Sequence, residues 1–152
     1  MIESLMLAAV IAAGPAQKHD APPIVQHRSS EMMTGPKLPY RGKYWRSHQR
    51  KVTLCILKRE SNNHWFSTNR ANGYFGGFQF SKPLAHGATW MMLPELKQLF
   101  GKRESRRIAV KLRSHEMHKW APFYQHMAFA TVYNWQGTAK GRAHWAGGRW
   151  SC

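Results

Sequence analysis

The chain has 152 residues, a length that suits one ordinary domain and leaves little room for two separate cores. Hydrophobic residues make up 43% and aromatic residues 12% of it, so wholesale disorder is not expected. The 23 Lys and Arg against 7 Asp and Glu give a formal charge of +16, which predicts a polyanionic partner such as nucleic acid, an anionic membrane or an anionic cell wall.

The N-terminal residues 1–16 resemble a secretory signal peptide in part. An apolar run at residues 5–13 is followed by small residues and a proline, as before a cleavage site, but the only early charge, Glu3, is acidic rather than basic. The run is too short to span a bilayer, so no transmembrane segment is expected. The alternative is a buried or fraying N-terminal helix of a protein that is delivered in another way, for example in a virus particle.

Residues 17–46 contain four prolines among Lys, Arg, His and Ser, and they show no apolar period of 2 or 3.6 residues. We interpret this segment as a basic, Pro-containing linker before a domain at residues 47–152.

From Ser47 the pattern becomes helical. Ser47 is a candidate cap, and the apolar spacing that follows predicts a helix that ends near Ser61. Residues 74–80 combine aromatic residues with Gly76 and Gly77, which predicts a tight hairpin or a looped crossing.

Three further helices are predicted in the second half of the chain. One covers residues 93–100 and is started by Pro94, and the next covers residues 104–120 and is ended by Pro122. The third covers residues 123–135, has a buried face, and is stopped by Gly137.

Two cysteines, Cys55 and Cys152, exclude a four-cysteine zinc site. If they pair, they close a ring around nearly the whole core segment, for which loop-closure entropy gives about 4–5 kcal/mol. Such a bond needs an oxidising compartment, whereas two free thiols would suit a reducing cytosol. We favour the pair, because a C-terminal cysteine forms core poorly.

Carboxylates are scarce after position 50, where only four glutamates occur: Glu60, Glu95, Glu104 and Glu116. Glu60 ends an apolar helix and precedes the Gly-rich aromatic segment. There it can face a groove wall formed by Trp65, Tyr74 and Phe78, where desolvation favours a protonated general acid. The alternative is a surface glutamate that pairs with Lys58 or Arg59.

The residues around Glu60 also carry a resemblance. The segment CILKRES at residues 55–61, Trp65, the string NGYFGGFQF at residues 72–80, and Trp90 closely resemble the core of resuscitation-promoting factors, which are lysozyme-like, transglycosylase-like domains that act on peptidoglycan. The match covers residues 47–152. It implies a small α+β, mostly helical, lysozyme-like domain with a short β-hairpin lobe and a glycan groove. It also implies a Cys55–Cys152 disulfide and Glu60 as the catalytic acid.

By the same resemblance, further residues line the glycan groove: Trp65, Asn72, Tyr74, Gly77, Gln79 and Trp90. Each aromatic residue among them has core packing as its alternative. Three features depart from the family pattern. Residues 81–89 are longer than expected, residues 93–120 look like an insertion, and Asn62 and Asn63 replace the usual Gly-Gly.

The scarcity of carboxylates favours a one-carboxylate mechanism, lytic transglycosylation, over hydrolysis, which usually needs a second carboxylate. Hydrolysis by a muramidase stays open if Glu95, Glu104 or Glu116 folds into the groove. The alternative for these three is a helix-surface charge that pairs with nearby Lys or Arg.

We expect no cofactor and no metal, because His115 and His118 lack the H-E-x-x-H spacing. Seven Lys and Arg at residues 102–119 suit an anionic cell-wall polymer or DNA, or form only a solvated helix face. The expected protein is a secreted, monomeric enzyme of the cell wall that acts on peptidoglycan glycan strands. The alternatives are a non-catalytic binding protein for nucleic acid or glycan, and a phage virion component that carries the wall-cleaving domain.

Overall fold

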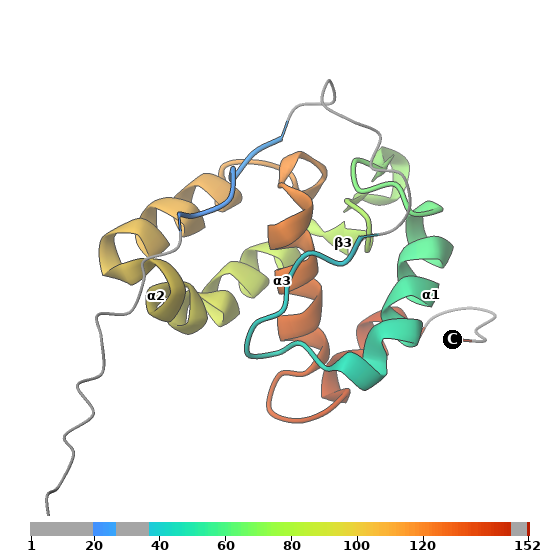
Figure 1. Cartoon of the computed structure of the whole chain (residues 1–152). Coiled ribbons are helices and arrows are strands. Elements are labelled where there is room, and N and C mark those ends of the chain that lie inside the picture. The colour runs from blue at the N-terminus through green and yellow to red at the C-terminus, as the bar shows by residue number, and fades with distance from the viewer. Residues whose placement is uncertain (1–19, 27–36, 147–151) are drawn as a thin grey trace, which may run out of the picture.

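Figure 1 shows the computed structural model, which describes residues 20–26, 37–146 and 152. The predicted signal segment at residues 1–16 therefore lies outside the described residues. The α-helices are α1 (Arg50–Ser61), α2 (Lys82–Arg113) and α3 (Pro122–Tyr133). Short 3-10 helices are η1 (Ser47–Gln49), η2 (Arg70–Asn72), η3 (Met117–Lys119) and η4 (Lys140–Trp145). The strands β1 (Thr68–Asn69), β2 (Tyr74–Phe75) and β3 (Phe80–Ser81) form one antiparallel sheet in the order β1-β2-β3. The mixed α+β, mostly helical class is confirmed.

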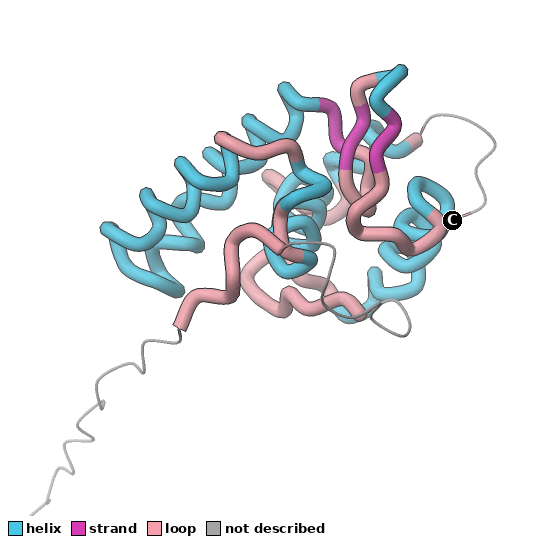
Figure 2. The backbone as a smooth tube through the Cα atoms, turned by 90° about the horizontal axis from the view of Figure 1, so that it is seen from above, coloured by secondary structure: helices cyan, strands magenta, loops and turns pink. Residues whose placement is uncertain are grey.

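Helix α3 lies between α1 and α2, with the sheet at the end of the molecule opposite the bend in α2 (Figures 1 and 2). Its sequence is apolar on nearly all sides, and 11 of its 12 residues are buried. The helix was expected at residues 123–135 and is confirmed. Pro122, however, is its first residue and does not end the preceding helix, because proline fits the first helical position, where no N–H partner is needed.

Helix α2 differs from the two helices predicted for this region. It begins at Lys82, where the Ser81 hydroxyl accepts a hydrogen bond from the Leu84 N–H, so Pro94 lies inside the helix rather than at its start. At Gly101 the backbone leaves the helical region (φ 80°, ψ 167°), and the bend turns the second arm back along the first. The second arm ends at Arg113 instead of Trp120.

The described parts of the predicted linker pack into the domain. Ile24, Leu38 and Tyr40 are buried in the core, and Val25 forms an antiparallel bridge with Trp120. Apolar burial thus begins well before residue 47, because these few apolar side chains find partners far along the chain.

The predicted hairpin is confirmed. Strands β2 and β3 pair with Phe75 opposite Phe80, and residues 76–79 form the turn. Strand β1 adds a third strand, which the sequence did not predict, with Thr68 opposite Phe75.

The disulfide is also confirmed: Cys55 on α1 is bonded to Cys152, with 5.6 Å between the two Cα atoms and a sequence separation of 97. Across the described ranges, no helix combines the length and apolar character that a membrane crossing requires.

Candidate active site

Glu60 lies in the last turn of α1, and the end of this helix is set by two asparagines. Asn62 and Asn63 both have a positive φ (53° and 67°), and their N–H groups donate to the carbonyls of Lys58 and Leu57. Glycine adopts this region most readily, and asparagine tolerates it better than most other residues. The asparagine pair therefore allows the sharp turn for which two glycines would otherwise be expected.

The hairpin turn packs on the side of α1 that carries Glu60. A Cβ built on Gly77 would lie 2.6 Å from Cδ1 of Leu57 and 3.0 Å from Cε3 of Trp65, so a larger residue would force these side chains to shift. Leu57 is three residues before Glu60, and residues at that spacing share a helix face. Gly77 is thus a packing residue that brings the hairpin next to the Glu60 face.

Gln125 on α3 links the hairpin turn to the segments that contain Trp65 and Trp120. From buried α3, its Oε1 accepts a hydrogen bond from the Gly77 N–H at 2.8 Å, and its Nε2 donates to the carbonyls of Trp65 (3.0 Å) and Trp120 (2.8 Å). This residue was not predicted from the sequence. An amide within the apolar run of α3 was the available signal, because a buried amide needs partners.

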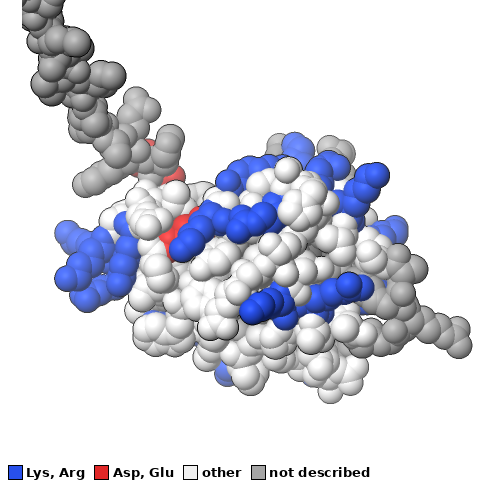
Figure 3. Space-filling view, turned by 90° about the horizontal axis from the view of Figure 1, so that it is seen from below, with Lys and Arg blue, Asp and Glu red and all other residues white. Residues whose placement is uncertain are grey.

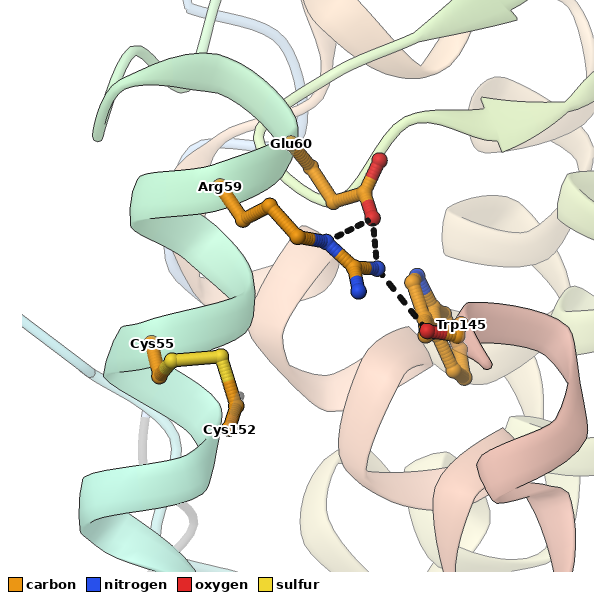
Figure 4. Close-up of a disulfide and its surroundings, with 5 residues drawn as sticks. All are labelled: Cys55, Arg59, Glu60, Trp145 and Cys152. Atoms are coloured by element: carbon orange, nitrogen blue, oxygen red, sulfur yellow. Dashed lines mark hydrogen bonds and ion pairs between the residues drawn. A yellow bond between two sulfur atoms is a disulfide. The ribbon is translucent and has the colours of Figure 1, made fainter. Parts of the chain in front are cut away.

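The Glu60 carboxyl is 22% exposed and is held on one oxygen. Arg59 donates to Oε1 through Nε at 2.9 Å and through Nη2, and the same Nη2 also donates to the carbonyl of Trp145 at 2.8 Å. Figure 4 shows the carboxyl pointing away from α1, with Cys55 of the disulfide on an earlier turn of the same helix. Oε2 has no hydrogen-bond partner among the described residues, so only Oε1 is fixed.

Two of the three aromatic side chains expected to line a groove beside Glu60 are core residues. Trp65 is only 5% exposed and packs edge to face on Phe78, with 5.6 Å between ring centroids, and Phe78 is stacked on Phe129. The expectation that Trp65 stacks on a sugar is corrected, because neither face of a buried ring is accessible. Tyr74 on β2, at 43% exposed, remains accessible.

The other predicted groove residues have diverse surroundings. Asn72 is exposed in η2. Gln79 has a positive φ of 51°, and its Nε2 donates to the carbonyl of Gly76 at 2.7 Å, so its side chain closes the hairpin turn. Trp90 on α2 is 61% exposed, and the guanidinium of Arg113 lies 4.2 Å from its ring centroid. Among the described residues, no contact links Trp90 to Glu60.

The three glutamates that were candidates for a second carboxylate are all engaged elsewhere. Glu95 is buried on α2 and accepts hydrogen bonds from the Tyr40 hydroxyl (2.7 and 2.8 Å) and the Lys43 N–H; burial, together with this bond, raises the pKa of Tyr40. The hydrogen bond from Arg107 lowers the pKa of Glu104. Glu116 lies 3.6 Å from Nδ1 of His118. These contacts fit the helix-surface alternative for Glu104, which pairs with Arg107 on the same helix. They do not fit it for Glu95, which is buried, or for Glu116, which lies between α2 and η3.

Within the part of the chain that is described, no cluster of three or more His, Cys, Asp or Glu side chains could hold a metal ion. The chain matches no family model, no curated protein and no solved structure.

Proposed function

We propose that this protein cleaves the glycan strands of peptidoglycan, with Glu60 as the single general acid and base. The observation that carries the proposal is the position of the Glu60 carboxyl. It lies in the last turn of α1, on the face against which the hairpin turn packs, with Oε1 fixed by Arg59 and Oε2 without a hydrogen-bond partner among the described residues. A carboxyl that is held in this way can present a proton in a defined direction to a bound ligand.

The proposed reaction uses this carboxyl twice. Protonated Oε2 gives its proton to the glycosidic oxygen, the bond from that oxygen to the anomeric carbon breaks, and the leaving sugar departs as an alcohol. The resulting carboxylate then removes a proton from a hydroxyl of the same sugar, whose oxygen bonds to the anomeric carbon. The proton returns to Glu60, no water is consumed, and the product is an anhydro sugar.

Engagement of the other glutamates supports this route over hydrolysis. A retaining hydrolase needs a second carboxyl about 5 Å from the first, and an inverting hydrolase needs one about 6.5–9.5 Å away. Glu95 is bound to Tyr40, and Glu104 is bound to Arg107. A one-carboxylate mechanism requires neither to leave its partner.

Arg59 is a positioning residue in this proposal. Its guanidinium joins Oε1 of Glu60 to the Trp145 carbonyl and so fixes the rotamer of the acid. Tyr74 and Asn72 are the exposed residues on the sheet side that are available to contact sugar, and Gly77 and Trp65 act through packing.

The test is digestion of purified peptidoglycan, with the released muropeptides identified by mass spectrometry. Wild type is compared with Glu60→Gln, which keeps the size of the side chain but removes the acid, and with Glu104→Gln, a matched change at a surface glutamate. Anhydro products from wild type and Glu104→Gln, with a loss of at least about 100-fold in Glu60→Gln, are expected. Reducing-end products would instead mean that water attacks.

A non-catalytic binding protein is the second candidate, and the Arg59–Glu60 pair favours it, because a surface glutamate without a catalytic role forms such pairs. In that case neither wild type nor Glu60→Gln releases products, and binding to peptidoglycan or nucleic acid is equal in both. For location we propose the cell wall, since the Cys55–Cys152 disulfide persists in oxidising surroundings. A phage virion that carries the same domain is the alternative.

A further inference from the structure

A concave surface lies away from Glu60. It is a cleft of about 850 Å³ between the segment at residues 21–26, the stretch that includes β1 and Arg70, and the region from the second arm of α2 to η3. In Figure 1 the segment at residues 20–26, drawn in blue, runs beside η3, where the Gln26 N–H donates to the carbonyl of Lys119. No residue of α1 lines the cleft, so it is separate from the proposed active site.

Three elements contribute cations to the lining of the cleft: η2 contributes Arg70, α2 contributes Arg107 and Lys111, and η3 contributes Lys119. Arg107 is paired with Glu104, and Arg70 lies 3.8 Å from Glu116. Lys111 and Lys119 are exposed and have no carboxylate within salt-bridge distance among the described residues. The cleft thus contains two cationic side chains whose charges are not balanced by a neighbour.

The segment at residues 21–26 also contributes apolar residues to the lining, among them Pro22, Pro23 and Val25. A cleft of this volume accommodates a ligand of several heavy-atom groups rather than a single ion. Cationic and apolar side chains in one cleft suit a chain in which phosphates alternate with short carbon units.

We propose that this cleft binds the phosphodiester backbone of an anionic cell-surface polymer. Lys111 and Lys119 contact the phosphates, and the proline-containing wall packs against the carbon units between them. The Cys55–Cys152 disulfide favours such a polymer over nucleic acid, because it indicates an oxidising compartment outside the cytosol. The proposal does not depend on catalysis by Glu60.

Positive charge is not confined to the cleft, so the experiment needs a control variant that loses the same charge elsewhere. Figure 3 shows Lys and Arg side chains in several groups over another view of the surface, with far fewer carboxylates. A variant that loses two charges weakens binding to any polyanion to some extent. The cleft pair must therefore be compared with an equal loss elsewhere on α2.

The experiment titrates fluorescent poly(glycerol phosphate) with wild type, Lys111→Gln/Lys119→Gln, and the control Lys97→Gln/Lys102→Gln. Both control lysines are exposed and do not line the cleft. We expect the cleft variant to bind about tenfold more weakly, by about the strength of two exposed ion pairs. The dependence of log K on log salt should fall by about 1.4 in slope, at about 0.7 for each phosphate that a lysine no longer neutralises. The control should change affinity less than about threefold, and circular dichroism should show all variants folded.

Two outcomes would overturn the proposal. Equal losses in the two double variants would mean that binding follows net charge and not the cleft. Tighter binding of single-stranded DNA with the same number of phosphates would assign the cleft to nucleic acid. Glu60→Gln, measured in the same titration, should bind the polymer as wild type does. Polymer binding by the cleft can therefore be judged separately from catalysis by Glu60.

Discussion

Replacing Gly77 with Ala tests whether the hairpin turn is packed against α1 as closely as the structure shows. The added Cβ would lie 2.6 Å from Cδ1 of Leu57 and 3.0 Å from Cε3 of Trp65, well inside the contact distance of about 3.5–4.0 Å for carbon atoms. Both neighbours are buried, and in a close-packed core neither can move without displacing others. Overpacking of this kind costs about 1–3 kcal/mol, so we expect the free energy of unfolding to fall by that amount.

Gly87→Ala is the matched control. Gly87 lies in the first arm of α2, and a Cβ built there meets nothing within 4 Å. Alanine at this position changes only the helix propensity of the backbone, which should raise the free energy of unfolding by about 1 kcal/mol. The same substitution is therefore expected to have opposite signs at the two glycines.

The assay is urea unfolding followed by tryptophan fluorescence, with the disulfide intact in both variants. Peptidoglycan digestion of the folded Gly77→Ala variant should also slow, because the turn that packs beside Glu60 is displaced. If Gly77→Ala were as stabilising as Gly87→Ala, the hairpin turn would not be seated on Leu57, and the geometry proposed for the site would be refuted.

Three other results are expected. Reducing Cys55–Cys152, which are 97 positions apart, should lower the free energy of unfolding by about 4–5 kcal/mol in urea titrations with and without dithiothreitol, and a change below about 1 kcal/mol would contradict the entropic estimate. Gln125→Leu leaves one buried N–H and two buried carbonyls without this partner and should cost about 2–5 kcal/mol; a neutral effect on the urea midpoint would refute its role. Burial, with a smaller effect of a nearby arginine, lowers the pKa of His126 to about 3, so the unfolded chain binds the extra proton below about pH 6.5. The free energy of unfolding is therefore not reduced by His126 above that pH, and it falls by about 1.4 kcal/mol per pH unit as the pH drops toward 3. The variant His126→Phe should show a smaller difference in the free energy of unfolding between urea titrations at pH 7 and at pH 5.

Local patterns in the sequence predicted the parts of the fold that depend on neighbouring residues. Helix α1 follows from its apolar spacing, the hairpin follows from glycines between aromatic residues, and α3 follows from a long apolar run. The pairing of Cys55 with Cys152 was favoured over two free thiols because a C-terminal cysteine forms core poorly, and the bond is present.

Features that depend on distant contacts were not predictable in this way. Pro94 indicated a helix start by the usual preference, but Ser81 supplies the actual cap, and α2 accommodates the proline in its interior. The prolines before residue 47 indicated a linker, so the burial of Leu38 and Tyr40 was not predicted. Their burial depends on residues far along the chain.

The same limit applies to the candidate site. The position of Glu60 at the end of a helix could be derived from the asparagines that follow it, although its ion pair with Arg59 was foreseen only as the alternative. An aromatic residue near a glutamate has the same sequence signal whether it stacks on sugar or fills the core. Trp65 proved to be core because Gly77 allows the hairpin to cover it.

The bond from α1 to the last residue also affects how the protein survives damage. A single backbone cut between Cys55 and Cys152 leaves both fragments in one covalent molecule, since the two halves stay joined through sulfur. A protein nicked once in this stretch would keep its mass on a non-reducing gel and separate only after reduction. Its fragments would also stay at a high effective concentration, which favours their reassociation. In surroundings rich in proteases, α1 and Glu60 would thus stay attached to the rest of the protein after one cut in the backbone.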